Sequence, residues 1–253
     1  MTDITLEKPP ARRFDFSRLF TLFIRPRRAF EEMASEARAS WLTPMLVLTL
    51  TAILVVLVSG YLKTRASSLG QIELPPDWQH WSPEMQNNYM QAQQATQGTT
   101  FVYVIPLVGS LTSLWLGWVI VAGLLHLGST LLGGRGSMQS ALNIVAWASL
   151  PFVIRDLLRV AYMLMAKHII ANPSLSGFAT SSGFFSQLLA RLDLFVIWYI
   201  VLLIIGMAIA DGLTRGKAVA GVALVILLVV LAQAGLGTLT SGFGGQAVQR
   251  PFF

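Results

Sequence analysis

Five long apolar stretches occupy most of the chain and restrict the folds that are open to it. They cover residues 41–62, 100–132, 138–167, 188–211 and 217–237. At 1.5 Å per residue, a helix of about 20 residues crosses a hydrocarbon core about 30 Å thick. Helices satisfy their own backbone hydrogen bonds, as lipid requires. The sequence therefore predicts an all-α integral membrane protein whose domain at 41–238 is a five-span transmembrane helix bundle.

Composition supports this class and argues against several kinds of chemistry. Hydrophobic residues make up 54% of the chain and charged residues only 12%, a balance that is not typical of a soluble domain. Without cysteine the chain has no disulfide and no thiolate site, and its three histidines are too scattered to predict a metal site. The spans contain no paired acids, no Ser/Lys pair and no His-Glu-x-x-His motif. We therefore expect no enzyme activity, no cofactor, no metal and no nucleic-acid partner.

Residues 1–40 are predicted to form a cytoplasmic tail with amphipathic interfacial helices. The segment FDFSRLFTLFIR interleaves aromatic and basic residues, and Pro26 is suited to the first turn of a second helix. Three interpretations stay open: the apolar stripe packs on the protein's own bundle, it anchors the chain to lipid, or it docks a soluble partner. The residues expected on the membrane-surface or docking face are Phe14, Phe16, Arg18, Phe20, Phe23, Arg25 and Phe30.

The distribution of basic residues predicts how the chain is threaded. With five spans and a cytoplasmic N-terminus, 11 Lys and Arg residues lie on the cytoplasmic side, 8 of them in the first 40 positions, against 5 on the other side, and Arg155 and Arg159 are left within the third span. This threading makes the loop and helix at 66–99 extracytoplasmic; Ser82-Pro83-Glu84 there is typical of a helix start. Residues 239–253 are predicted to form a flexible C-terminal tail on the extracytoplasmic side.

Small residues recur at four-residue spacing in two of the predicted spans. One set is Gly109, Ser113 and Gly117, and the other is Gly206 and Ala210. Such spacing lets a second helix approach closely, which favours helix association in lipid. These residues are predicted helix-packing positions, and the partners expected are membrane lipids and other integral membrane proteins.

The third apolar stretch contains the charged residues that most need an explanation. Arg155, Asp156 and Arg159 follow Pro151, which predicts a helix kink, and Asp193 lies close to the start of the fourth span. One interpretation is an intramembrane ion cluster of the four charged residues that joins the third and fourth spans. The alternatives are a buried arginine pair that binds an anionic head group or lines a pathway.

Three segments resemble a known family. The block GGRGSMQSALNIVAWASLP, the segment DLFVIWYIVLLIIGMAIADGLTRGKAVAG and the helix PRRAFEEM are similar to the bacterial branch of the Yip1 family. The resemblance covers most of residues 20–238. It implies five spans, a cytosolic N-terminus and no known catalytic activity. Eukaryotic members act in membrane traffic between the endoplasmic reticulum and the Golgi and contact Rab-type GTPases, whereas some bacterial ones are associated with ABC exporters or with resistance to peptide toxins.

This chain departs from the eukaryotic pattern in two places. It lacks the Asp-Leu-Tyr-Gly-Pro signature, and Ala146-Trp147-Ala148-Ser149-Leu150-Pro151 replaces a block that contains Gly-Tyr. A bacterial inner membrane is therefore the expected location. Two functions remain: a non-enzymatic adaptor or accessory subunit of a larger membrane complex, or a small transporter, lipid-handling or permeability module that uses Arg155 and Arg159.

Overall fold

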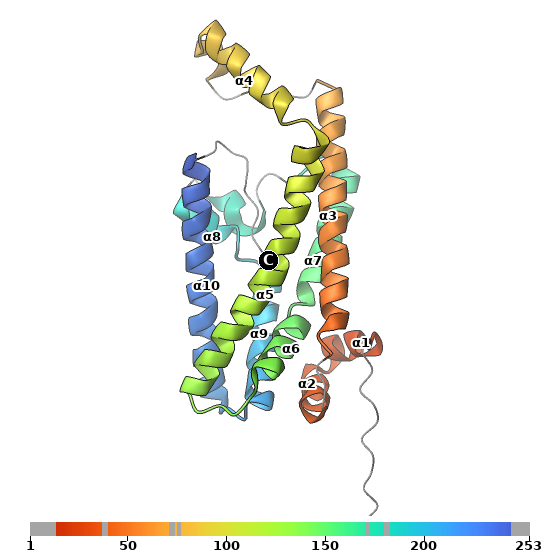
Figure 1. Cartoon of the computed structure of the whole chain (residues 1–253), viewed down its shortest axis with the longest axis vertical. Coiled ribbons are helices and arrows are strands. Elements are labelled where there is room, and N and C mark those ends of the chain that lie inside the picture. Colours follow the sequence, from red (N-terminus) through yellow and green to blue (C-terminus); the bar gives the residue numbers. More distant parts are fainter. Residues whose placement is uncertain are drawn as a thin grey trace, which may run out of the picture. The chain divides into compact units, whose positions relative to one another are not determined.

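All secondary structure in the described part of the chain is helical (Figure 1). The computed structural model describes residues 14–36, 40–70, 74, 77–170, 173–179 and 183–243, without the side chains of 240–243. Four helical stretches in the described part of the chain are long and apolar enough to cross a membrane: Leu42–Ser68, Thr100–Leu131, Met138–Ala166 and Arg215–Leu239. A fifth apolar helix, α9 (Leu194–Ala210), has 17 residues. The chain is therefore an all-α protein with four candidate membrane-spanning helices.

Several helix bounds differ from those expected from the sequence. The helix α3 (Leu42–Ser68) continues past residue 62, and α10 (Arg215–Phe243) includes 239–243, which had been expected in the flexible tail. Leucine-rich residues before α9 form a separate short helix, α8 (Phe184–Leu189), which is why α9 begins later than residue 188. The remainder of the predicted tails, residues 1–13 and 244–253, lies outside the described residues.

The third apolar stretch consists of two helices. α6 (Met138–Ala148) begins after Ser137, whose hydroxyl accepts a hydrogen bond from the Ser140 N–H at 3.1 Å, and α7 (Pro151–Ala166) follows after a break at 149–150. Proline has no N–H to donate, and its ring clashes with the preceding turn, so it belongs at the start of a helix and not in its interior. The break therefore lies where Pro151 is predicted to kink the stretch.

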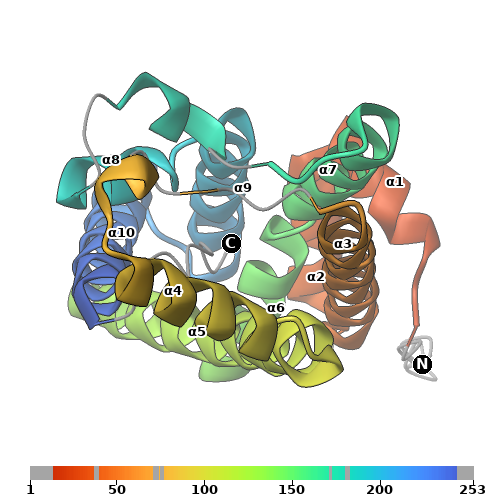
Figure 2. The ribbon, with the colours of Figure 1, turned by 90° about the horizontal axis from the view of Figure 1, so that it is seen from above.

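One compact unit comprises 1–47, 118–151 and 194–232. In it, α2 (Pro26–Ser35) and α6 both pack on α9, and Figure 2 shows α6 beside α9 in the view along the helices. Gly206 is a point of close approach. A Cβ atom there would come within 2.6 Å of Ile144 Cγ2 and 3.1 Å of Phe30 Cε1. The core of this unit also contains Trp147, whose side chain is completely buried.

A second unit comprises 48–117, 152–193 and 233–253. Its apolar core joins α3 to α7 through Leu62, Val160 and Met163. Its further helices include α4 (Pro83–Ala95), the start of α5 (Ile105–Leu131) with the preceding π-helical turn η2 (Thr100–Val104), and the short helices η1 (Trp78–His80), η3 (Ser174–Phe178) and α8. The cap predicted for α4 is present, because the Ser82 hydroxyl accepts a hydrogen bond from the Met85 N–H at 3.3 Å.

Candidate functional site

The second unit brings together the four residues of the predicted ion cluster. Arg155 Nη1 lies 3.7 Å from Asp193 Oδ2, and Arg155 Nε donates to Asp156 Oδ1 at 3.4 Å. Arg159 Nη1 lies 3.9 Å from the same Asp156 oxygen. The Arg155 side chain is 8% exposed, and its guanidinium lies 4.5 Å from the centre of the Phe152 ring.

The cluster balances two cations with two anions. Arg155 points at Asp193, the residue before α9, and the Ser174 hydroxyl donates to the same carboxylate at 3.3 Å. Breaking a buried ion pair by removing one partner leaves an uncompensated charge, which costs about 3 to 5 kcal/mol. This geometry suits a clasp that holds Arg155 of α7 to Asp193 within the second unit.

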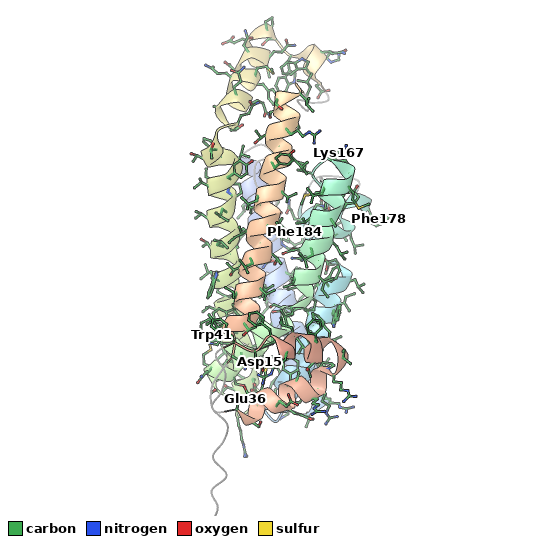
Figure 3. The ribbon with its side chains drawn as sticks, turned by 90° about the vertical axis from the view of Figure 1, so that its right-hand side faces the viewer. Asp15, Glu36, Trp41, Lys167, Phe178 and Phe184 are labelled. Atoms are coloured by element: carbon green, nitrogen blue, oxygen red, sulfur yellow. The ribbon has the colours of Figure 1, made fainter. Side chains whose placement is uncertain are left out.

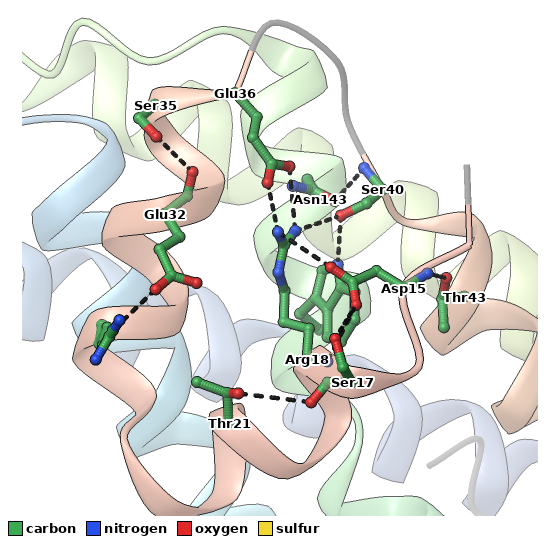
Figure 4. Close-up of polar contacts among 12 residues, drawn as sticks. Asp15, Ser17, Arg18, Thr21, Glu32, Ser35, Glu36, Ser40, Thr43 and Asn143 are labelled. Carbon is green, nitrogen blue, oxygen red and sulfur yellow. Dashed lines mark hydrogen bonds and ion pairs between the residues drawn. The ribbon is translucent and has the colours of Figure 1, made fainter. Parts of the chain in front are cut away.

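A second charge cluster, in the first unit, surrounds Arg18 of α1 (Ser17–Ile24) (Figure 4). The Arg18 guanidinium forms a two-pronged pair with the Glu36 carboxylate, in which Nη1 donates to Oε2 at 3.1 Å. Arg18 Nη2 also lies 3.3 Å from Asp15 Oδ2. Such planar, charge-assisted contacts are stronger than neutral hydrogen bonds.

This Arg18 cluster reaches the helices of the bundle through Ser40. The Ser40 hydroxyl accepts from Arg18 Nη1 and from Trp147 Nε1, both at 3.2 Å. The Ser40 backbone N–H donates to Asn143 Oδ1 at 3.1 Å. Arg18 therefore ties α1, the end of α2, the start of α3 and α6 to one another.

Asp15 orients the N-terminal end of α1. Its carboxylate accepts from the Ser17 hydroxyl at 2.6 Å and from the Arg18 N–H at 3.2 Å, and its own N–H donates to Thr43 Oγ1 at 3.0 Å. Burial raises the pKa of Asp15, but the hydrogen bond from Ser17 and the charge of Arg18 outweigh it, so the pKa lies below its ordinary value. The charged form of Asp15 is thus the one the fold favours.

The residues predicted for the membrane-surface or docking face separate into two groups. Arg18 and Phe30 are 8% and 1% exposed, and Phe23 lies edge-on to Trp198 with ring centres 5.3 Å apart. Arg18 differs from the exposed position expected for it, because its guanidinium is buried between the carboxylates of Asp15 and Glu36. Phe30 packs against Gly206, in agreement with the interpretation that part of the stripe packs on the protein's own bundle. The outward-facing group is Phe14, Phe16, Phe20 and Arg25.

The two sets of small residues differ in their surroundings. Gly206 is in close contact with α2 and α6, and Ala210 is half-buried one turn later. At Gly109 a Cβ atom would meet no other atom within 4 Å, and the Ser113 hydroxyl donates to the Gly109 carbonyl. Gly117 is half-buried further along the same helix. The ridge Gly109-Ser113-Gly117 thus begins in open space.

A third polar cluster joins two loops of the first unit. Asp211, in the loop after α9, accepts a hydrogen bond from the Ser129 hydroxyl, and its backbone carbonyl accepts from the Arg135 N–H at 3.1 Å. A side chain at Gly136 would overlap the Asp211 carboxylate. Burial raises the pKa of Asp211, although the Ser129 hydrogen bond and the charge of His126 oppose the rise. Asp211 therefore joins the α5–α6 loop to the α9–α10 loop.

Sequence reasoning missed the Arg18 and Asp211 clusters. Local signals existed, because Asp15 lies one helical turn before Arg18 and Asp211 ends an otherwise apolar run. The partners Asn143 and Trp147 are more than 100 residues from Ser40, so no local pattern could connect them. Among the described residues, no group of three or more His, Cys, Asp or Glu side chains is placed to hold a metal ion.

Comparison with known proteins places the chain in a family. The model of the Yip1 domain matches residues 20–237, which run from α1 into α10. The chain belongs to the Yip1 family. No curated protein and no solved structure matches it. The Yip1 match includes Arg155, Asp156, Arg159 and Asp193 together with Asp211, whereas Asp15 and Arg18 precede it.

Membership of the Yip1 family and the four long apolar helices together make this chain a membrane protein. The family is not a known family of enzymes. The charged residues of the Yip1 domain described above are engaged with one another or with neighbouring polar groups.

Proposed function

We propose that this Yip1-family chain is a non-enzymatic adaptor or accessory subunit of a larger membrane complex. The observation that carries the proposal is a contrast along its apolar helices. Arg155 and Asp193 are paired with each other, whereas Gly109 on α5 opens onto empty space. Charges that face one another stabilise the chain itself. An open ridge of small residues contributes favourable packing energy only when another helix covers it.

The proposal includes five crossings of a bacterial inner membrane. At 1.5 Å per residue, the 17 residues of α9 extend about 25 Å, which is at the short end of the range for a membrane span. The excess of Lys and Arg before α3 supports a cytoplasmic N-terminus and an extracytoplasmic C-terminus. The bacterial branch of the family is supported by the missing Asp-Leu-Tyr-Gly-Pro signature.

The N-terminal helices are proposed to lie at the cytoplasmic membrane surface. Phe14, Phe16, Phe20 and Ile24 are 48%, 51%, 74% and 76% exposed. The Arg25 side chain, between α1 and α2, is also exposed. Exposed aromatic rings beside arginines are suited to an anionic lipid surface.

The occupant proposed for the ridge is a transmembrane helix of another integral membrane protein. Gly109, Ser113 and Gly117 are spaced by four residues, so they lie on one face of α5. The Ser113 hydroxyl is satisfied by its own helix, so it places no unpaired polar group in the way of close backbone contact. Large side chains follow one another elsewhere on the same helix, including Val108, which is 58% exposed.

Co-purification from native membranes in mild detergent tests this proposal. The wild-type chain and Val108→Leu are expected to retain a membrane-protein partner, and Gly109→Leu to lose it, because leucine at 109 holds the partner helix away. Val108→Leu is the matched control, since it enlarges an exposed side chain next to the ridge. Recovery of the wild-type chain as a monomer alone, or retention of the partner by Gly109→Leu, would contradict the proposal.

The transporter alternative receives less support from the geometry. Arg155 is paired with Asp156 and Asp193, and Arg159 lies beside Asp156, so both arginines already have counter-charges. A binding site for an anionic substrate needs a cation that is free to receive it. Transport or anion binding that disappears in the double variant Arg155→Ala with Arg159→Ala, in a protein that still folds, would reverse this preference.

A further inference from the structure

The chain that follows α7 turns back along the helix. Lys167, the first residue after α7, has a positive φ of 59°, as at many helix ends that reverse direction. The reversal brings Ser174 to Asp193, and Asp193 to Arg155. Arg155 lies 11 residues before Ala166, or about 16 Å along the helix. In Figure 3, where the long axis is vertical, Phe178 and Phe184 lie below Lys167.

Contacts with α10 give a second indication of where α8 lies along the membrane-spanning helices. Arg191, two residues after α8, donates from Nε to Gln233 Oε1 at 3.2 Å and from Nη2 to the Gln233 carbonyl at 2.9 Å. A Cβ atom on Gly237 would come within 2.8 Å of Gln187 Oε1. Both Gln233 and Gly237 belong to the candidate membrane span Arg215–Leu239. The chain around α8 therefore lies beside the C-terminal end of a candidate membrane span.

The segment from Ile169 to Ala190 contains no charged residue. Within it, the described helices η3 and α8 expose large apolar side chains. Leu175, Phe178, Phe184 and Phe185 are 41%, 81%, 44% and 63% exposed. Exposed large apolar side chains on helices that carry no charge are unfavourable in water and favourable in lipid.

Several polar groups of η3 and α8 are satisfied within the protein, which lowers the cost of placing them in hydrocarbon. In η3, the Ser176 N–H and hydroxyl both donate to the Pro173 carbonyl. In α8, the Gln187 N–H donates to the Gly183 carbonyl at 3.0 Å. Arg191, which is 6% exposed, directs its guanidinium to amide and carbonyl oxygens of Gln187 and Gln233.

We propose that η3 and α8 form a re-entrant membrane segment whose phenylalanine side chains contact lipid acyl chains. The segment precedes α9, which at about 25 Å is shorter than a hydrocarbon core of about 30 Å. By folding back beside α7 and the end of α10, it supplies apolar surface within the second unit. The occupant of the exposed face is lipid, whichever way the chain is oriented in the membrane.

The absence of native cysteine allows a direct test with single-cysteine variants of the full chain. Phe185→Cys and, separately, Phe178→Cys are reconstituted in vesicles of phosphatidylcholine and phosphatidylglycerol that are permeabilised so that reagent reaches both faces. Met85→Cys on the polar helix α4 is the control, because Met85 is 51% exposed, close to the 63% of Phe185. Protein burial therefore does not separate the two positions, and any difference between them reports the environment outside the chain.

The variants at 178 and 185 are expected to react with a charged maleimide about tenfold more slowly than Met85→Cys, because a thiolate does not form in hydrocarbon. A fluorescent label at these positions is expected to be quenched by lipids that carry a nitroxide on the acyl chain. Equal reactivity at 85 and 185 would overturn the proposal, as would slow reaction without quenching, which indicates cover by protein. Gel filtration checks the fold, and Leu175→Cys replaces any variant that fails to fold.

Discussion

Two helical segments outside the long apolar helices expose aromatic side chains, yet they are attached to the protein in different ways. The α1–α2 segment is rich in charge, and its buried arginine, Arg18, is held by two carboxylates. The η3–α8 segment is uncharged, and the buried arginine that follows it, Arg191, is held by amide and carbonyl oxygens. Similar aromatic content is thus combined with two different kinds of anchor.

The difference follows from the surroundings of each anchor. The side chains of Asp15 and Glu36 remain 21% and 27% exposed, so these carboxylates keep part of their hydration while they pair with Arg18. An additional ion next to Arg191 would have to be removed from water beside the apolar helix α10, at a cost of several kcal/mol. Neutral acceptors avoid that cost. The α1–α2 anchor should therefore respond to charge and pH, and the η3–α8 anchor should not.

The largest expected effect is that of Arg18→Met, which leaves Asp15 and Glu36 without their common counter-charge. We expect a loss of about 2 to 4 kcal/mol, measured as the thermal unfolding of the protein in detergent micelles. Arg27→Met is the control, because the Arg27 side chain is 71% exposed and its pair with Glu31 is worth about 0.5 kcal/mol or less. Equal destabilisation by the two variants would remove the distinction between the anchor and the surface pairs.

Gly206→Ala should disturb the packing of α2 on α9. The new Cβ atom would lie 2.6 Å from Ile144 Cγ2, so side chains must shift, at a cost of about 1 to 3 kcal/mol. Tryptic cleavage at Arg27 and Arg28 should accelerate as α2 loosens. Gly109→Ala is the matched control. Its new Cβ atom meets nothing within 4 Å, and the substitution also removes a glycine from a helix interior, so it should not destabilise the protein. Unchanged cleavage in Gly206→Ala would show that this contact does not hold α2.

Arg191→Gln should loosen η3–α8 without affecting α1–α2. The variant loses hydrogen bonds to Gln187 and Gln233, with an expected cost of about 1 to 2 kcal/mol. Hydrogen exchange of the α8 amides, Phe184–Leu189, should become faster, and by the same factor at low and high salt. Exchange that changes in α1, or that depends strongly on salt, would mean that the two anchors are not independent.

Acidification should produce the smallest effect, and only in α1–α2. Because the folded state lowers the pKa of Asp15, its contribution is complete above the unfolded value of about 3.9 and is lost as the pH falls through the folded value. We expect at most about 1 kcal/mol. An environment-sensitive label on Phe20→Cys, read between pH 7 and 3, should shift in the wild-type background and less in Asp15→Asn. The same label on Phe185→Cys should not shift; a shift there would contradict the comparison.

Much of the architecture was accessible from the sequence, as was one of the three polar clusters. Apolar length predicted the four long helices, and Pro151 predicted the interruption between α6 and α7. The contact between Arg155 and Asp193 followed from charge signs in neighbouring apolar runs. The direction of the Arg18 side chain could not be predicted from the sequence. An amphipathic pattern shows which residues share a helix face, but it does not show whether a cation on that face contacts lipid or a carboxylate.

Helices in this chain arise from local causes, since apolar runs, caps and a proline act within one or two turns and are readable in order along the chain. The placement of Ser40 beside Trp147, and of Gln187 beside Gly237, depends on segments that are distant in sequence. Such contacts are chosen when the helices pack, because only then does each buried polar group find its partner. The fold class and the helix positions were therefore determined by local sequence. Tertiary packing determined that α1–α2 is held by ions and η3–α8 by neutral oxygens.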